Sequence, residues 1–341
     1  MTLGSDAATP ASHAGGAGRT VLRRIRKGMV VALVLIAFLL LAGAGYEALA
    51  GGVDAYPFPP PGQMVDVGGY RMHIHCVGDG SPTVLLDAGL SGSSLDWSLV
   101  QPDIGTTTRV CAVDRAGEGW SEPGPAPRSP HQIAGELYRL VTAAGIAGPY
   151  VLVGHSLAGK NVRLFALDHP DEVVGMVLVD GRSEYVDAHT SAADADAFQR
   201  AMRGEDLLYG TARRFGIARL LGSRLMGAPT MPAATRAAIA ILNSRPAAIE
   251  ATTAEAVQRA TDDAQLAAAP SLGAMPLIVL VAGQNAVSDP LWLEAQQRQA
   301  ALSSNSRLNV VDGSGHYIHW EHPAVVIDAV RGVVEEVRSR P

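Results

Sequence analysis

The ten residues from Tyr150 to Gly159 (YVLVGHSLAG) constrain the fold of this chain more than any other stretch. They begin as a short apolar run and end in small residues around Ser156, and a helical pattern follows at once. This order predicts a strand, a sharp turn and a helix, with the hydroxyl of Ser156 lifted out of the sheet on a strained backbone. The residues two before and two after such a serine must be small, and here they are Gly154 and Ala158. Ser156 is therefore a candidate nucleophile.

Strand and helix patterns alternate along the body of the chain, which begins near Met64. Strands are predicted at 64–67, 70–77, 83–87, 109–113, from 150 to the turn, and at 174–179, 276–282 and 306–311, and helices at 133–144, 158–168, 290–302 and 323–338. Such alternation predicts an α/β domain over 64–341, with a mostly parallel sheet covered on both faces. The stretch of about 182–270 shows helical patterns alone and predicts an inserted cap.

An apolar run of 19 uncharged residues, Gly28–Tyr46, precedes the body. As a helix it would span about 28 Å, close to the thickness of a bilayer core. Five basic residues and one acid lie before it, and the next Lys or Arg is Arg71. The positive-inside rule then predicts a cytoplasmic N-terminus and an exported body. Residues 28–50 are thus predicted to be a transmembrane anchor or, because Ala48-Leu49-Ala50 resembles a cleavage site, a signal peptide that leaves a secreted body.

The segments on either side of this run differ in composition. Residues 1–27 are predicted to be a disordered, basic cytoplasmic tail, and residues 51–63, with four prolines, an extended linker. The tail carries +4 of a total charge of −6, so the rest of the chain carries −10. An acidic body argues against nucleic acid as a partner, because binding phosphates requires a basic surface.

Four motifs, taken in this order, resemble the α/β-hydrolase superfamily. They are Ala88-Gly89-Leu90 after the third strand, Asp114-Arg115-x-Gly-x-Gly-x-Ser after the fourth, the Gly154–Ala158 turn, and Ser314-Gly315-His316 before the last helix. The chain is most similar to lid-bearing serine hydrolases, which include esterases, proline iminopeptidase-like enzymes and cofactor-free haloperoxidase-like enzymes. The resemblance implies an eight-stranded sheet whose second strand is antiparallel, a cap after strand six, and no cofactor.

The resemblance assigns a general base to the nucleophile, because a serine hydroxyl is weak alone. The base is His316, in a glycine-rich loop after the last strand. His319 and His322 follow at three-residue steps, a spacing that suits a loop or a helix start as well as a metal site. Because no carboxylate-rich partner motif accompanies them, no metal site is predicted.

The acid of the expected triad is open between two aspartates. The usual position lies about three residues after the glycine that ends strand seven; that glycine is Gly283, and the residue there is Ala286. Asp289 is nearby, but it precedes Pro290 and suits a helix N-cap. Asp180 ends strand six, where some superfamily members place the acid. We favour Asp180 and keep Asp289 as the alternative, since either gives the order Ser, Asp, His.

The backbone amides of Leu90 and Leu157 are expected to form the oxyanion hole. Trp97, Trp120 and His155 are candidates for lining the substrate pocket, and packing around the turn is an equally good interpretation of all three.

The implied fold places strands two and four side by side and antiparallel, with Cys76 and Cys111 toward the same end. Opposed residues there lie about 4.5–5.5 Å apart, within disulfide range. An exported body would permit oxidation. A Cys76–Cys111 disulfide is therefore expected, with two free core thiols as the alternative.

The expected function is a serine hydrolase that cleaves a carboxylic ester of an apolar small molecule through an acyl-enzyme. An ester is expected because its leaving group departs easily, and cap residues such as Leu207, Leu208 and Phe215 suggest an apolar acyl or alcohol group. An aminopeptidase, an amidase or a haloperoxidase-like enzyme with the same triad is an alternative. A catalytically silent binding protein on this fold is an alternative of another class.

Overall fold

Eight strands form a single sheet in the order β1-β2-β4-β3-β5-β6-β7-β8 in the computed structural model, which describes residues 15–53, 58–217, 220–221, 224 and 227–340. Strand β2 is antiparallel to its neighbours β1 and β4, and the other pairs are parallel. The predicted fold class is therefore confirmed. The strands are β1 (Gln63–Asp66), β2 (Arg71–Val77), β3 (Thr83–Asp87), β4 (Val110–Val113), β5 (Tyr150–His155), β6 (Val173–Val179), β7 (Leu277–Ala282) and β8 (Ser306–Val311).

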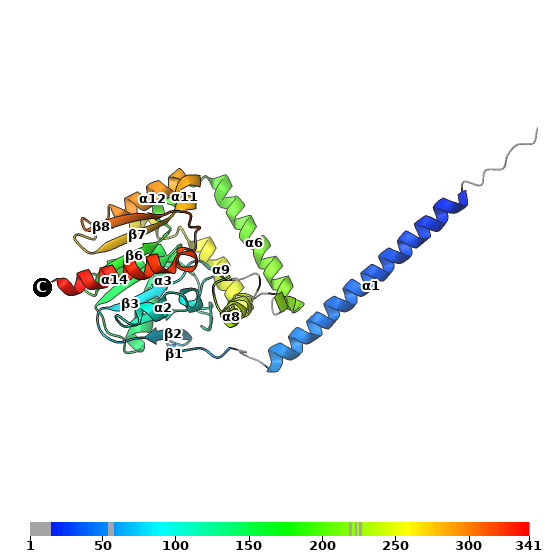
Figure 1. Ribbon diagram of the computed structural model, residues 1–341, viewed down its shortest axis with the longest axis horizontal. Helices are drawn as coiled ribbons and strands as arrows, with labels where there is room; N and C mark the ends of the chain where they lie inside the picture. The colour runs from blue at the N-terminus through cyan, green and yellow to red at the C-terminus, as the bar shows by residue number, and fades with distance from the viewer. Residues whose placement is uncertain (1–14, 54–57, 218–219, 222–223, 225–226, 341) are drawn as a thin grey trace, which may run out of the picture.

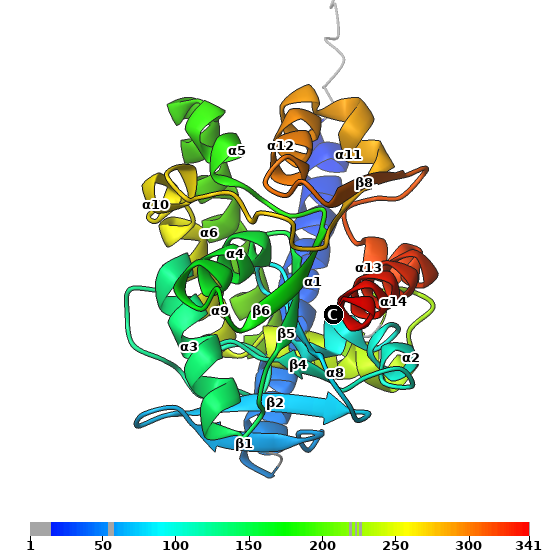
Figure 2. The same ribbon diagram turned by 90° about the vertical axis from the view of Figure 1, so that its left-hand side faces the viewer.

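Helices cover both faces of the sheet because the central strands are apolar on both faces. Every residue of β3, β4 and β5 is buried. Helices α3 (Pro130–Ala143) and α4 (Ala158–Asp168) pack on one face, and α2 (Gln101–Ile104) and α14 (Pro323–Ser339) pack on the other. Figure 2 shows these two layers on opposite sides of the strands. The short elements η1 (Ser94–Trp97), α11 (Gly283–Ser288), α12 (Pro290–Ala300) and α13 (Ile318–Glu321) complete the domain.

The cap lies between β6 and β7 in the chain, as its composition predicts. It contains α5 (Glu184–His189), α6 (Ala192–Arg214), α8 (Ala233–Asn243), α9 (Pro246–Gln258) and α10 (Asp263–Ala267). Helices α6 and α9 pack against each other. The side-chain amide of Asn243 on α8 donates to the carbonyl of Ser91, just after β3, so the cap lies beside the end of the sheet where the parallel strands finish.

Helix α1 (Gly15–Val53) is longer than the apolar run and extends away from the body (Figure 1). The stretch Val21–Leu49 contains the apolar run and is long and apolar enough on average to cross a membrane. Two expectations need correction, because residues 15–27 of the predicted disordered tail and 51–53 of the predicted linker are helical. Good helix formers extend the helix past both ends of the apolar run, Leu22, Arg23 and Arg24 before it and Ala48, Leu49 and Ala50 after it. The parts of those predictions at residues 1–14 and 54–57 lie outside the described residues.

Cys76 on β2 and Cys111 on β4 are opposite each other in the antiparallel register and form a disulfide. The bond lies toward the start of β4, at the end of the sheet away from Ser156.

Candidate active site

The turn after β5 holds Ser156 in the conformation that its motif predicts. Ser156 has a φ of +51°, in the left-handed region that costs a side chain energy. Its backbone carbonyl accepts hydrogen bonds from the amides of Gly159 (3.0 Å) and Arg182 (2.7 Å), which hold the turn. A Cβ on Gly154 would lie 2.7 Å from the carbonyl oxygen of Ala158, so a larger residue at Gly154 would collide across the turn.

His316 contacts both Ser156 and Asp180. Its Nε2 lies 2.8 Å from Ser156 Oγ, and its Nδ1 lies 2.6 Å from Asp180 Oδ2. An ionised carboxylate accepts only, so Nδ1 donates to Asp180 and Nε2 is left to accept the hydroxyl proton. The three side chains come from the ends of β5, β6 and β8, which the parallel sheet brings to one edge. We call this edge, with Ser156, Asp180 and His316, the catalytic edge.

Asp180 is fully buried and accepts hydrogen bonds from three groups besides His316. The amide of Ala282 (3.0 Å) and the indole N–H of Trp292 (2.8 Å) donate to Oδ1, and the side-chain amide of Asn285 (2.6 Å) donates to Oδ2. These donors stabilise the ionised form and fix the direction of the carboxylate. Asn285 and Trp292 were not singled out from the sequence, where nothing relates them to a residue more than 100 positions earlier.

Asp289, the alternative acid, lies at the N-cap of α12. Its Oδ1 accepts a hydrogen bond from the amide of Trp292 at 3.2 Å. It therefore fixes the start of the helix that carries Trp292, which in turn donates to Asp180. This geometry favours Asp180 as the partner of His316 and gives Asp289 a supporting position.

The loop that carries Leu90 approaches Ser156 closely at Gly89. A Cβ on Gly89 would lie 2.7 Å from His155 Nδ1 and 3.1 Å from Ser156 Cβ, so only glycine fits there. Arg115 holds the loop by donating to the carbonyls of Ala88 (2.5 Å) and Gly89 (2.7 Å). In the described part of the chain, the amides of Leu90 and Leu157 donate no hydrogen bond to a backbone acceptor.

Arg115 also joins this loop to the cap. It is buried and forms ion pairs with Asp87 (2.8 Å) and with Glu255 of α9 (2.9 Å). Glu118 lies in the same buried cluster and accepts a hydrogen bond from Thr252 of α9 at 2.8 Å. Burial, with the nearby charge of Glu255, raises the pKa of Glu118 to about 8. Glu255 was not predicted, because its pairing with Arg115 spans 140 residues.

Two buried histidines lie beside His316. His155 Nε2 is 3.0 Å from the backbone carbonyl of His316, and the ring of His319 lies 4.4 Å from the ring of His155. Burial, together with the neighbouring histidines, lowers the pKa of His155 well below its usual range and that of His319 to about 3. Both rings therefore stay neutral, and of these three histidines His316 is the one that contacts Ser156 Oγ.

The two tryptophans proposed as pocket residues make packing contacts. Trp97 is fully buried, and its ring lies 4.7 Å from that of His319. The indole N–H of Trp120 donates to the carbonyl of Phe58 at 2.8 Å, and its ring lies 5.0 Å from His73. These contacts favour the packing interpretation for both, and a role of either in binding substrate stays a prediction.

The family model for the alpha/beta hydrolase fold matches residues 82–323, and the chain belongs to that family. The matched range contains all three residues of the catalytic edge.

Individual relatives are similar over the body of the chain. A Hormonema carpetanum protein named as a probable transporter is 25% identical over 304 residues, which cover 81% of this chain and 43% of that protein. This chain thus spans less than half of that relative. A thermophilic esterase from Thermogutta terrifontis has a TM-score of 0.60 at 22% identity, over 81% of this chain and 98% of the esterase. The epoxide hydrolase CorEH has a TM-score of 0.59 at 22% identity, over 81% and 98% of the two chains. At these identities the solved structures support the fold alone.

Proposed function

We propose that this hydrolase cleaves a carboxylic ester with an apolar acyl or alcohol group through an acyl-enzyme on Ser156. The observation that carries the proposal is the chain of hydrogen bonds from Asp180 through His316 to Ser156 Oγ. Ser156 is partly exposed and can meet a substrate, whereas Asp180 is buried. Enzymes of this fold that open epoxides or carbon–halogen bonds use an aspartate in the position of Ser156, so the serine favours acyl transfer.

The geometry suits both halves of ester hydrolysis. As Ser156 Oγ attacks the ester carbon, its proton passes to His316 Nε2, and the carbonyl oxygen becomes an oxyanion bound by the amides of Leu90 and Leu157. His316 then gives the proton to the departing alcohol, which leaves the acyl group on Ser156. A water loses its proton to His316 and attacks the acyl carbon, and the acid leaves as Ser156 regains its proton. Asp180 stays ionised and stabilises the imidazolium in both halves.

We further propose that α1 anchors the body to a membrane with the body on the exported side. Four of the five basic residues before the apolar run lie at 23–27, next to its start, and the first basic residue after it is Arg71. The disulfide supports export, because structural disulfides are rare in a reducing cytoplasm. External proteinase treatment of intact cells should degrade the body. Complete protection of the body would contradict this orientation.

Hydrolysis of soluble p-nitrophenyl esters of graded acyl length by the full chain in detergent tests the enzyme assignment. Ser156→Ala should lower kcat by on the order of a million-fold if the three residues act as a unit. Ser288→Ala, a change on exposed α11, is the matched control and should keep the parent rate. A parent without activity on any ester, or Ser156→Ala with the parent rate, would refute the proposal.

A further inference from the structure

The cap exposes large apolar side chains at the end of α6 and in the residues that follow it. We call the described residues of this surface the cap tip: Leu207, Leu208, Ile217, Leu220 and Leu221. Leu207, Leu208 and Leu220 are 73%, 66% and 65% exposed. Large apolar side chains that stay exposed together in one segment of a folded domain mark an interaction site. We therefore expect these side chains to be covered by a binding partner that is not part of the body.

The charges around the cap tip are mainly positive. The sequence from Arg203 to Met226 contains five arginines against two acids, Glu205 and Asp206, although the chain beyond residue 27 carries −10 overall. Arg203, Arg214 and Arg224 are exposed beside the apolar side chains. Leucine with an excess of arginine is the composition of segments that lie in a membrane interface, where apolar groups enter the acyl region and cations meet anionic headgroups.

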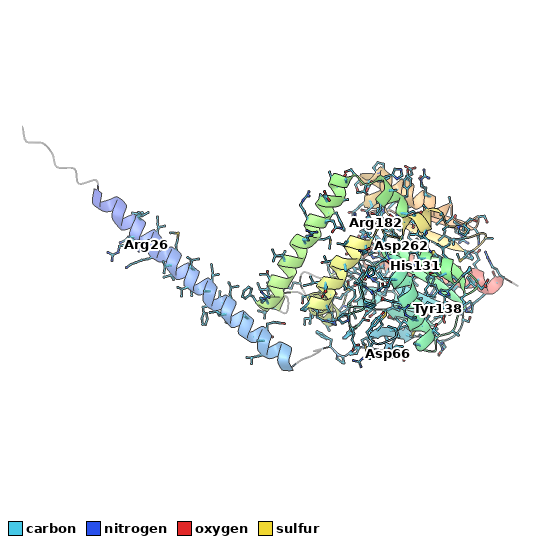
Figure 3. The ribbon with its side chains drawn as sticks, turned by 180° about the vertical axis from the view of Figure 1, so that it is seen from behind. Arg26, Asp66, His131, Tyr138, Arg182 and Asp262 are labelled. Carbon is cyan, nitrogen blue, oxygen red and sulfur yellow. A yellow bond between two sulfur atoms is a disulfide. The ribbon has the colours of Figure 1, made fainter. Side chains whose placement is uncertain are left out.

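The cap tip lies against the helix that is long enough to cross a membrane. Gly43 of α1 packs on the backbone of Phe215, where a Cβ at Gly43 would overlap the Phe215 carbonyl. A Cβ at Gly216 would lie 3.2 Å from the Gly43 carbonyl oxygen and 3.3 Å from the ring of Tyr46. Figure 1 shows the end of α6 beside the end of α1 nearest the body, and Figure 3 shows Arg26 on the part of α1 far from it.

The position of this contact along α1 indicates how deeply the cap tip would lie in a membrane that α1 crosses. The candidate span ends at Leu49, so Gly43 lies six residues and Tyr46 three residues before its end. At about 1.5 Å per residue these are about 9 Å and 4.5 Å inside the end of the span. Interfacial helices enter a leaflet to a depth of about 5–10 Å. A membrane crossed by α1 would therefore reach Phe215 and the cap tip beside it.

We propose that the cap tip is seated in the leaflet on the body's side of the span, and that a phospholipid bilayer is the partner that covers its leucines. The substrate would then be an ester with a long acyl chain that is dissolved in that bilayer. The inference that the cap tip enters the membrane is based on its exposed apolar side chains and on its contact with α1. The substrate class rests in addition on the proposed ester hydrolase function.

Site-specific fluorescence quenching tests the seating. Both native cysteines are in the disulfide, so a single new cysteine can be labelled without removing others. The variants Leu208→Cys and Leu221→Cys are each labelled with an environment-sensitive dye at the new cysteine. The full chains are then placed in nanodiscs of phosphatidylcholine and phosphatidylglycerol that contain a doxyl-labelled lipid as the quencher. Val287→Cys on α11, 87% exposed, is the matched control.

We expect strong quenching at residues 208 and 221 and little at residue 287. Equal quenching at all three positions would overturn the seating. A dye at residue 208 or 221 that is not quenched, and whose emission changes only when two chains share a disc, would show that a second copy covers the cap tip.

Paired substrates test the substrate class. The full chain in nanodiscs is given a long-chain diacylglycerol in the bilayer or a soluble short-chain p-nitrophenyl ester. For the double variant Leu207→Ser/Leu208→Ser the ratio of the two rates should fall about tenfold, because the serines weaken partition into the interface. Val287→Ser should keep the parent ratio.

The outcomes of the two experiments are separable. A parent chain that hydrolyses neither ester refutes the proposed function, while the quenching still decides the seating. A parent that hydrolyses the soluble ester, with the same ratio in the double variant, refutes the membrane substrate alone.

Discussion

The catalytic edge and the cap tip differ in whether their side chains find partners within the chain. Asp180 is fully buried and accepts four hydrogen bonds from groups of this chain. At the cap tip Leu207 is 73% exposed. The polar groups of the catalytic edge find their partners within the chain, so the chemistry of this region can be deduced from its contacts. The apolar side chains of the cap tip have to be covered by a partner, and the position of the cap tip relative to α1 indicates which partner this is.

Of the changes that test this comparison, we expect the largest loss of activity when the acid of the catalytic edge, Asp180, is replaced. Asp180→Asn would reverse the hydrogen-bonding requirement at His316 Nδ1 and favour the wrong imidazole tautomer. We expect kcat for ester hydrolysis to fall by about ten-thousand-fold. For Asp289→Asn, at the N-cap of α12, kcat should fall by less than about tenfold, because asparagine caps a helix nearly as well as aspartate. A larger loss in Asp289→Asn than in Asp180→Asn would show that the acid is misassigned.

Gly89 tests the oxyanion loop. Gly89→Ala would push the loop away from His155 and Ser156, since the added Cβ has no room. If this displaces the Leu90 amide, kcat should fall by about a hundred- to a thousand-fold. Gly332→Ala on α14, where a Cβ meets nothing within 4 Å, is the control. Steady-state kinetics that are equal in the two variants would contradict the role of the loop.

The buried cluster that joins the cap to the catalytic edge should make stability depend on pH. The pKa of Glu118 is about 8, above its ordinary value of 4.5, so between these values the folded chain binds more protons than the unfolded chain. Its contribution to the free energy of unfolding therefore falls as pH rises from about 4.5 to 8.

Glu118→Gln cannot ionise and should be more stable than the parent at pH 8.5, by on the order of 2–4 kcal/mol. At pH 4 the two should be nearly equal. Urea unfolding of the full chain in detergent at both pH values measures this, with Glu250→Gln on the exposed face of α9 as control. A parent whose stability is constant or increases from pH 5 to 8 would contradict the burial of an ionisable Glu118.

The smallest effect is expected at the cap tip. In detergent, Leu207→Ser/Leu208→Ser should change the free energy of unfolding by less than about 0.5 kcal/mol per residue, as exposed positions do. Leu137→Ala in the core, fully buried on α3, should cost about 2–5 kcal/mol. A comparable loss at both places would mean that the cap-tip leucines pack inside the fold.

The sequence was sufficient for the fold because each strand carries its own signal. The apolar run of β5, the small residues of its turn and the helix pattern after it are all local. Residues 15–27 and 51–53 are exceptions, since their glycines are typical of a disordered or extended segment, whereas they continue the helix of the apolar run.

The site was predictable only where its residues lie in local motifs. Ser156 and His316 each follow a recognisable pattern, but Asp180 and Asp289 look alike at the level of sequence. What separates them is three donors, the Ala282 amide and the side chains of Asn285 and Trp292, that fold onto Asp180 from over 100 residues away. Glu255 was missed for the same reason.

The most direct test of Ser156 as the nucleophile is the mass of the full chain after reaction with a fluorophosphonate, followed by peptide mapping. We predict one adduct per chain, on the peptide that contains Ser156, and its loss in His316→Ala because the hydroxyl then lacks a base. No adduct on the folded parent chain, or an adduct on another residue, would contradict the account.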